Sequence, residues 1–299
     1  MSNLKKNLVL FFSSVLFTLF LAEIILRLFV VQETKRLAIY DRDLGWRGKP
    51  NGNGNYVRKE DAINVPFSYN ELGFRDDPLA PRASVKRRIA LLGDSFLENL
   101  EVPYEKTFLA LLKQELKQSS TDAVALMSQG YSTAQELKAL QKFYDAVQPD
   151  AVILLFYTGN DYEDNLRREF AYLDERGELV FPENKDSWLK QQNLAFQRWL
   201  YESSHLVFYV KNFLASRAAL KIEDESKKVK DESKEYKFSV TRKLILATKA
   251  YAEQRGVPFG LAVFTNKFEL RDHQMEKTEF VERVAREAGI PTLMFTDLH

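Results

Sequence analysis

The sequence IALLGDSF at residues 89–96 is the stretch on which the expected fold depends. Its first four residues are a short apolar run that follows three basic residues and ends at Gly-Asp, which predicts a buried strand closed by a tight turn. Ser95 therefore stands at the carboxyl end of a strand, where open α/β sheets place their ligand sites. This stretch alone leaves two interpretations open: Ser95 has a chemical role, or Asp94 and Ser95 only cap the helix that follows.

Strand and helix patterns alternate through the rest of the chain. Apolar runs rich in β-branched and aromatic residues predict strands, and apolar residues three and four positions apart predict helices. Such alternation is typical of a parallel, doubly wound sheet, so we expect an α/β domain with five parallel strands over residues 85–299. The predicted strands are 89–92, 123–127, 151–157, 258–264 and 291–295, and the predicted helices are 108–116 (capped by Thr107), 133–147 and 277–288.

The composition limits the chemistry available to the chain. Its net charge of +1 gives no reason to expect a nucleic-acid partner, and the absence of cysteine excludes thiolate nucleophiles, disulfides and cysteine metal sites. Only three histidines are present, so a histidine-dependent mechanism depends on His205, His273 or His299. The sequence contains no phosphate-binding loop or dinucleotide fingerprint, and we expect no cofactor.

Three acids, Asp161, Glu163 and Asp164, follow the third predicted strand closely. Negative side chains are favourable in the first turn of a helix, and these acids fit that position. We therefore assign them to a helix start and expect no metal site.

The N-terminal segment Leu8–Val31 is apolar apart from a few polar positions that include Glu23 and Arg27. As a helix it would be roughly 36 Å long at about 1.5 Å per residue, enough to cross a bilayer core of about 30 Å. Glu23 and Arg27 lie four positions apart with the acid first, the favourable order for an ion pair within a helix. A cleaved signal peptide is the alternative, but it needs a shorter apolar core and a small-x-small site. We therefore expect residues 1–31 to form an uncleaved transmembrane anchor.

Residues 32–84 are rich in glycine and proline and show no sustained period. We expect them to form a loop-rich collar between the anchor and the domain, with one short edge strand over 65–69.

Residues 162–243 interrupt the alternating pattern between the third and fourth predicted strands. We expect this helical insertion to contain a small hairpin around Asp174–Gly177 and a helix over 188–214. The run 221–237 is almost wholly charged and polar, and we expect it to be mobile.

Two further turns follow the next predicted strands: Gly130 comes after the second strand, and Asn160 comes after the third. Parallel strands bring their carboxyl ends to one edge of a sheet, so we expect Ser95, Gly130 and Asn160 to lie close together. Acyl transfer through a serine needs an oxygen nucleophile and donors aimed at the anionic oxygen of the tetrahedral intermediate. The backbone N–H groups of Ser95 and Gly130 and the amide of Asn160 are three such donors.

Residues 93–96 (Gly-Asp-Ser-Phe), Gly130 within Gln-Gly-Tyr-Ser, and residues 159–161 (Gly-Asn-Asp) together resemble the first three motif blocks of the SGNH (GDSL-type) hydrolase superfamily. The resemblance implies a flavodoxin-like SGNH fold and ester hydrolysis. It also implies that Ser95 is the nucleophile, and that Ser95, Gly130 and Asn160 form the oxyanion hole.

The collar adds to this resemblance. Residues 44–50 (Leu-Gly-Trp-Arg-Gly-Lys-Pro) and 70–76 (Asn-Glu-Leu-Gly-Phe-Arg-Asp) are similar to the segment before the first motif in membrane-anchored bacterial members. The resemblance therefore implies a single-pass protein of the bacterial inner membrane. Its globular domain would face the periplasm, an orientation that the basic residues around the span do not decide.

The last motif of the family, Asp-x-x-His, supplies the base and its orienting acid, and the chain shows no match to it. The sequence ends at Asp297-Leu298-His299, with a spacing one residue short. His299 is one candidate replacement, and His273 after the fourth strand is a second. His205 lies in an apolar helical stretch, which indicates a structural role. A truncated copy of a longer enzyme is a further interpretation.

The leading hypothesis is a serine-dependent ester hydrolase that acts on an envelope glycan, a lipid or a small ester. An O-acyltransferase of a cell-envelope polysaccharide would use the same serine chemistry with a sugar hydroxyl as acceptor. A membrane-tethered binding protein without turnover is the alternative from another class, and the missing histidine block favours it. The sequence names neither the substrate nor the oligomeric state.

Overall fold

The computed structural model of the chain falls into two compact units. The anchor unit comprises Met1–Leu37, Val57–Ile63 and Asp186–Asp231, and the sheet unit comprises Ala38–Tyr56, Asn64–Lys185 and Glu232–His299. The structure describes residues 3–30, 37–58, 61–183 and 233–296, together with 203–211, 213, 214 and isolated positions between 193 and 200.

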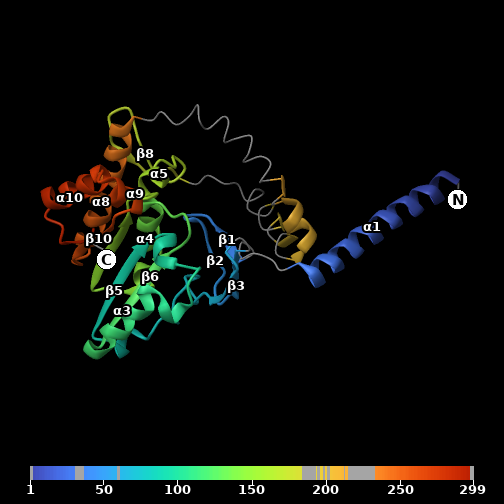
Figure 1. Cartoon of the computed structure of the whole chain (residues 1–299), viewed down its shortest axis with the longest axis horizontal. Coiled ribbons are helices and arrows are strands. Elements are labelled where there is room, and N and C mark those ends of the chain that lie inside the picture. Colours follow the sequence, from blue (N-terminus) through green and yellow to red (C-terminus); the bar gives the residue numbers. More distant parts are fainter. Residues whose placement is uncertain are drawn as a thin grey trace. The chain divides into compact units, whose positions relative to one another are not determined.

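A five-stranded parallel sheet forms the centre of the sheet unit (Figure 1). The strand order β11-β10-β7-β5-β6 is that of a flavodoxin-like sheet. The chain adds β6 on one side of β5 and then β7, β10 and β11 on the other side, so the order of the strands reverses between β5 and β7. The predicted α/β fold with five parallel strands is therefore confirmed. The strands are β5 (Arg87–Gly93), β6 (Thr121–Met127), β7 (Ala151–Tyr157), β10 (Phe259–Phe264) and β11 (Thr292–Phe295).

The central strand β5 is apolar because both of its faces are covered. Ala90 and Leu92 belong to the core on one side of the sheet, and Leu91 belongs to the core on the other side. All three are at most 1% exposed. A run that alternated polar and apolar residues would leave polar groups in one of these cores, so the continuous apolar run fixes β5 at the middle of the sheet.

Helices cover both faces of the sheet, as a doubly wound fold requires. The larger core contains residues of α4 (Thr133–Val147), α8 (Lys234–Glu253) and α10 (Glu276–Glu287), whereas α2 (Ser95–Glu98) and α3 (Phe108–Leu116) pack in the other core. Thr107 caps α3 as predicted, and its hydroxyl accepts the N–H of Ala110. The remaining short elements are α5 (Asp161–Asp164), α9 (Lys267–Asp272), and 3₁₀ turns at Arg82–Ser84, Tyr104–Lys106 and Lys117–Ser119.

The C-terminal part of the predicted insertion belongs to the sheet unit. Helix α8 begins at Lys234. Its residues Val240 and Leu244 are fully buried in a cluster with Ala134 on α4 and Phe170. The expectation of a mobile run therefore needs correction for residues 234–237, which are helical. The expected hairpin is present as β8 (Tyr172–Leu173) and β9 (Leu179–Val180). The remainder of the run and much of the expected helix over 188–214 lie outside the described residues.

The collar contains more regular structure than its glycine and proline content suggested. Besides the expected strand, found as β4 (Ile63–Ser68), it contains β1 (Ala38–Asp41), β2 (Gly45–Gly48) and β3 (Asn53–Arg58), which form two-stranded sheets β1-β2 and β3-β4. Its last part is tied to the central sheet, because the buried carboxylate of Asp76 accepts the N–H of Ala125 in β6 at 3.0 Å. The collar after residue 37 is thus largely part of the sheet unit.

Helix α1 (Asn3–Phe29) matches the predicted anchor within a few residues. Its stretch Leu4–Phe29 is long and apolar enough to cross a membrane and is not buried by the rest of the protein, and it is equally compatible with a signal sequence. The expected pair is present, with Arg27 Nε 2.7 Å from Glu23 Oε1. The Glu23 carboxylate also accepts the backbone N–H of His205 at 2.9 Å, so the described contact of His205 is structural.

Candidate functional site

The candidate site lies where the order of the strands reverses. Strand β5 ends at Gly93 and is followed by Asp94 and Ser95, and its neighbour β7 ends at Tyr157 and is followed by Asn160 and Asp161. Open α/β sheets bind ligands beyond the carboxyl ends of two such neighbouring strands. The fold therefore brings two of the predicted turns to the position where a ligand site is expected.

Ser95 and Asn160 are joined through one carboxylate oxygen. The Ser95 hydroxyl donates to Asp94 Oδ2 at 3.4 Å, and Asn160 Nδ2 donates to the same oxygen at 2.8 Å. Asp94 is itself held in place, because its other oxygen accepts the N–H of Phe96 at 2.8 Å as the N-cap of α2. The structure thus brings these two predicted site residues together.

Gly130 is connected to Asn160 through two charged side chains. Its carbonyl accepts a hydrogen bond from Arg167, which also donates to Asp164 at 2.6 Å, and Asp164 accepts from Asn160 at 2.6 Å. Gly130 has a φ of +71°, a left-handed conformation that favours glycine at this turn. The three predicted turns therefore share one hydrogen-bond network.

The donors expected to form an oxyanion hole differ in availability. Within the described part of the chain, the backbone N–H groups of Ser95 and Gly130 have no hydrogen-bond partner. The amide of Asn160, in contrast, already donates to Asp94 and Asp164. The two backbone N–H groups are therefore available as donors, whereas Asn160 would have to exchange one of its present bonds.

Among the residues that the structure describes, no histidine forms a hydrogen bond with the Ser95 hydroxyl. His273 ends α9 in a left-handed conformation with φ +52° and is exposed, and the one hydrogen bond found for the Ser95 hydroxyl goes to Asp94. Asp297 and His299 lie outside the described residues, so the role of His299 stays a prediction.

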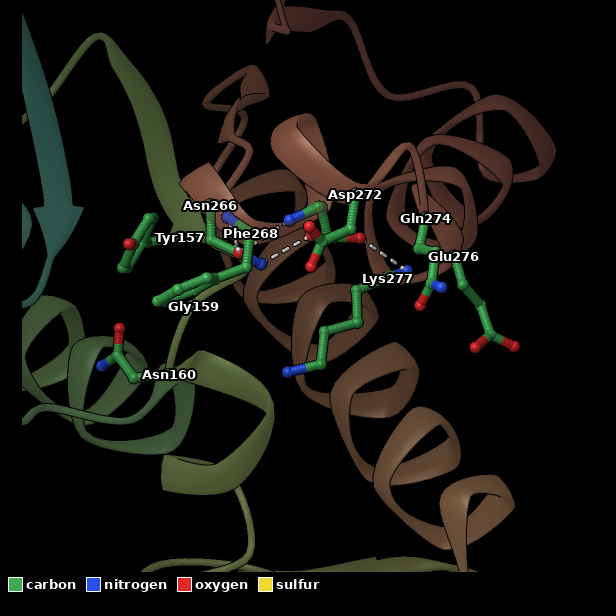
Figure 2. A pocket seen from close by; sticks show the side chains of 10 residues that line it. Tyr157, Gly159, Asn160, Asn266, Phe268, Asp272, Gln274, Glu276 and Lys277 are labelled. Atoms are coloured by element: carbon green, nitrogen blue, oxygen red, sulfur yellow. Dashed lines mark hydrogen bonds between the residues drawn. The ribbon is translucent and has the colours of Figure 1, made fainter.

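A pocket of about 480 Å³ opens beside Asn160 (Figure 2). The turn after β7 forms one of its sides, and α9 and the start of α10 form the other. Ser95 does not line it, so the pocket adjoins the network instead of enclosing it. The lining residues are Tyr157, Gly159, Asn160, Asn266, Phe268, Glu269, Asp272, Gln274, Glu276 and Lys277.

Exposed aromatic rings connect the Ser95 turn to this pocket. Phe96, which is 42% exposed, stacks on Tyr157 with ring centroids 4.7 Å apart and an interplanar angle of 12°. Phe268 on α9 is 55% exposed and lines the same pocket as Tyr157. These rings place an apolar surface next to the polar network.

Glu98 on α2 positions the Gly130 turn, and the sequence analysis did not identify it. Its carboxylate accepts the backbone N–H of Gln129 at 2.8 Å and the hydroxyl of Tyr69 at 3.0 Å. The side chain is only 2% exposed, and this burial raises its pKa from the usual 4.5 to about 7. A charged residue three positions after a motif serine is an ambiguous sequence signal, because helix surfaces commonly carry such residues.

The raised pKa predicts a pH-dependent stability that a Glu98→Gln variant lacks. Because the folded protein holds this proton more tightly than the unfolded chain does, Glu98 lowers the free energy of unfolding as the pH rises from about 4.5 to about 7. The decrease is on the order of 3 kcal/mol. Chemical denaturation of the full chain in detergent at pH 5 and pH 8 measures it, and Glu98→Gln should be more stable than the wild type only at pH 8.

The exposed acid on α3, changed in Glu115→Gln, is the matched control and should keep the pH dependence of the wild type. An unchanged pH dependence in Glu98→Gln would contradict the assignment.

The structure also adds acids to the site that the sequence analysis treated differently. Asp161 and Asp164 were assigned to a helix start, and they do form the first turn of α5, but they also face Asp94. Glu136, in the first turn of α4, was not singled out and is completely buried. The sequence did contain a signal for the meeting of the three aspartates, because Asp94 follows the end of β5 and Asp161 and Asp164 follow the end of its neighbour β7.

No family model and no curated protein matches the sequence. Among solved structures, AlinE4, an SGNH-hydrolase family esterase, aligns with a TM-score of 0.38 and 13% identity over 69% of this chain and 74% of its own. The psychrotrophic esterase EstA from Pseudoalteromonas sp. aligns with a TM-score of 0.36 and 12% identity over 70% of this chain and 78% of its own. A GDSL-like lipase from Bacteroides thetaiotaomicron gives a TM-score of 0.34 and 11% identity over 72% and 71%. The function of this chain is therefore inferred from its own residues.

Proposed function

We propose that the chain is a serine-dependent ester hydrolase of the SGNH type, held at the bacterial inner membrane by α1 with its sheet unit on the periplasmic side. The observation that carries the proposal is the meeting of Ser95 and Asn160 on one oxygen of Asp94 at the reversal point of the sheet. The motif resemblance of the Ser95, Gly130 and Asn160 turns supports the same assignment.

The proposed reaction begins with attack of Ser95 Oγ on the ester carbonyl carbon. The hydroxyl proton passes to a base, and the carbonyl oxygen becomes an anion that accepts hydrogen bonds from the N–H groups of Ser95 and Gly130. Collapse of this intermediate expels the alcohol, which takes up a proton, and leaves an acyl group on Ser95. Water then attacks the acyl-enzyme, which releases the acid and restores the hydroxyl.

The acceptor found for the Ser95 proton is Asp94, at 3.4 Å. This is longer than an optimal O–H···O hydrogen bond of about 2.7–2.8 Å, so the pair would have to close up for proton transfer. His299 remains the proposed alternative base, since the strand before it ends at the same edge of the sheet.

The surroundings favour a substrate with an apolar acyl group. Phe96 follows Ser95 directly, and its ring stacks on Tyr157 at the pocket wall. Aromatic rings of this kind bury apolar chains at roughly 25 cal/mol per Å² of covered surface. Lys277 and several acids in the pocket leave its far side polar, which suits a hydrophilic alcohol portion such as a sugar.

The first test is hydrolysis of p-nitrophenyl esters by the full chain in detergent micelles, compared with Asn160→Ala. We expect turnover by the wild type, and a kcat lower by about 10²–10³-fold in the variant with little change in KM. Asn160 would donate to the oxyanion mainly in the transition state, and loss of one such donor has this effect.

Gln114→Ala, which removes an exposed amide on α3, is the control and should retain the wild-type kcat. Absence of turnover by the wild type with acetyl through octanoyl esters would rule against a hydrolase of such esters.

A binding protein without turnover is the second candidate, because no described histidine contacts Ser95. In that case the N–H groups of Ser95 and Gly130 would bind an anionic or carbonyl oxygen of a ligand reversibly. Binding of an ester substrate without release of acid would favour this candidate.

A further inference from the structure

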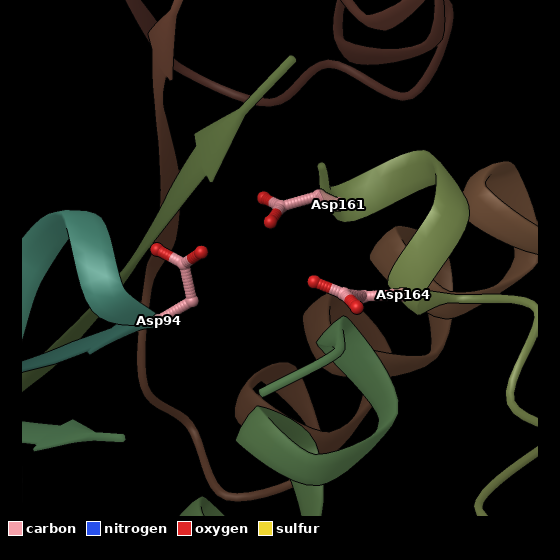
Figure 3. A group of neighbouring side chains, drawn as sticks. All are labelled: Asp94, Asp161 and Asp164. Atoms are coloured by element: carbon pink, nitrogen blue, oxygen red, sulfur yellow. The ribbon is translucent and has the colours of Figure 1, made fainter. Parts of the chain in front are cut away.

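Three carboxylates, at the starts of α2 and α5, converge beside the Ser95 turn, and the buried carboxylate of Glu136 on α4 interacts electrostatically with two of them. We call Asp94, Glu136, Asp161 and Asp164 the acid cluster. Asp94, Asp161 and Asp164 each offer an oxygen atom, and these atoms all lie within 4.8 Å of one another. Figure 3 shows the side chain of Asp94, from the start of α2, facing those of Asp161 and Asp164 on α5.

The protein neutralises little of this charge. Among the described residues, Asp161 Oδ2 accepts the N–H of Tyr157 at 2.7 Å, and the guanidinium of Arg167 pairs with Asp164 at 2.6 Å. The Asn160 amide supplies neutral donors to Asp94 and Asp164. Arg167 is thus the one cationic side chain found in contact with the acid cluster in the described part of the chain.

Three carboxylate oxygens have no partner within the described part of the chain: Asp161 Oδ1 and both oxygens of Glu136. The Glu136 side chain is 0% exposed and that of Asp161 is 1% exposed. A buried carboxylate without partners is strongly unfavourable, because it has lost the water that would solvate its charge. Either a proton on these groups or a bound cation would remove this cost.

Glu136 lies outside the group of three oxygens, but the charges of Asp94 and Asp164 act on its carboxylate. Burial raises its pKa well above the usual range, and the charges of Asp94 and Asp164 raise it further. Burial likewise raises the pKa of Asp161, with further contributions from Asp94 and Glu136. The four groups repel one another, so a positive ion between them would relieve both the repulsion and the missing contacts.

We propose that the acid cluster binds one Ca²⁺ ion. All the available ligands are oxygen atoms, which hard cations prefer. Oxygens bound to Ca²⁺ at about 2.3–2.6 Å lie at most about 5 Å apart, and the oxygens of Asp94, Asp161 and Asp164 fit that limit because all lie within 4.8 Å of one another. Mg²⁺ keeps most of its water and uses one or two carboxylates, which suits three converging carboxylates less well.

The ion would fix the geometry of the Ser95 turn, and because it would make Asp94 a weaker base, the Ser95 proton would then pass to the alternative base, His299. It would bind carboxylates that begin α2 and α5, and Asn160 lies between two of them through its bonds to Asp94 and Asp164. The proposal does not depend on ester hydrolysis, because a ligand-binding protein would use the same fixed geometry.

Calcium binding is tested on the full chain in detergent micelles after removal of metal with EGTA. We expect CaCl₂ at about 1 mM to raise the thermal unfolding midpoint by several degrees, because an ion that binds only the folded state stabilises it. Isothermal titration with CaCl₂ should give one site per chain. MgCl₂ at the same concentration should raise the midpoint less.

Variants that keep the side-chain shapes locate the site. Asp161→Asn and Asp164→Asn should each lose the calcium-dependent rise and weaken calcium binding at least about tenfold, as expected for the loss of a carboxylate ligand. Asp145→Asn, which changes an exposed acid on the same helix as Glu136, should respond like the wild type.

Three outcomes would overturn the proposal: no calcium response in the wild type, an undiminished response in both variants, or a larger response to magnesium. If the wild type shows no calcium response and Asp161→Asn removes part of its rise in stability on acidification, protons instead of calcium neutralise the cluster. Ser95→Ala should keep full calcium binding, so failure of the esterase proposal and failure of the calcium proposal are distinguishable.

Discussion

Ser95→Ala abolishes covalent labelling by a fluorophosphonate probe and lowers the hydrolysis of p-nitrophenyl esters by at least about 10³-fold. This result is expected because the proposed acyl-enzyme forms on Ser95 Oγ. Gel-based labelling of the full chain in detergent, together with initial rates at saturating ester, measures both effects.

Ser119→Ala is the matched control, since it removes an exposed hydroxyl after α3 and should label like the wild type. Labelling that persists in Ser95→Ala would contradict the assignment of the nucleophile. A wild type that neither labels nor turns over would instead favour the binding protein.

Arg75→Met lowers the free energy of unfolding by about 3–5 kcal/mol. Arg75 is 1% exposed and donates to the carbonyl oxygens of Glu98, Asn99 and Val102 at 2.9, 2.5 and 2.7 Å. Methionine fills a similar volume but donates nothing, so these acceptors lose their partner in the interior. Chemical denaturation at pH 7 measures the loss.

The control for Arg75→Met is Arg286→Met, which alters a side chain that is 73% exposed and should leave the denaturation midpoint unchanged. A similar midpoint for Arg75→Met and the wild type would show that the loop after α2 is held by other contacts. Because this loop follows Ser95, a destabilised Arg75→Met should also lose labelling.

The central sheet was predictable because each of its strands has a clear local sequence pattern. The run from Ala151 to Tyr157 is apolar and lies between Pro149-Asp150 and Gly159-Asn160, and the observed strand has the predicted bounds. The adjacency of Ser95 and Asn160 also followed from topology alone, since parallel strands end at one edge.

The collar strands and α8 were harder to predict for physical reasons. The collar strands contain glycine and proline, and they are stabilised by pairing and by contacts with the sheet instead of by local propensity. Helix α8 begins in a charged run, and its first buried apolar residue, Val240, comes only in its second turn.

The place of Glu136 beside the other acids was not predictable for a different reason. Glu136 lies on a helix whose other residues include exposed charges, and nothing in its local pattern shows that it faces inward. Only the folded structure brings its carboxylate close enough for the charges of Asp94 and Asp164 to act on it.

The buried contacts of the collar decide where the protein can be shortened for expression without its membrane helix. The carboxylate of Asp76 binds Lys113 on α3 at 2.5 Å and the backbone N–H of Ala125 in β6 at 3.0 Å. A shortened protein that began just before β5 would lack Asp76. Lys113 and the backbone of β6 would then lose their partner, and apolar surface would become exposed. A water-soluble version should therefore begin near Ala38, where the sheet unit starts.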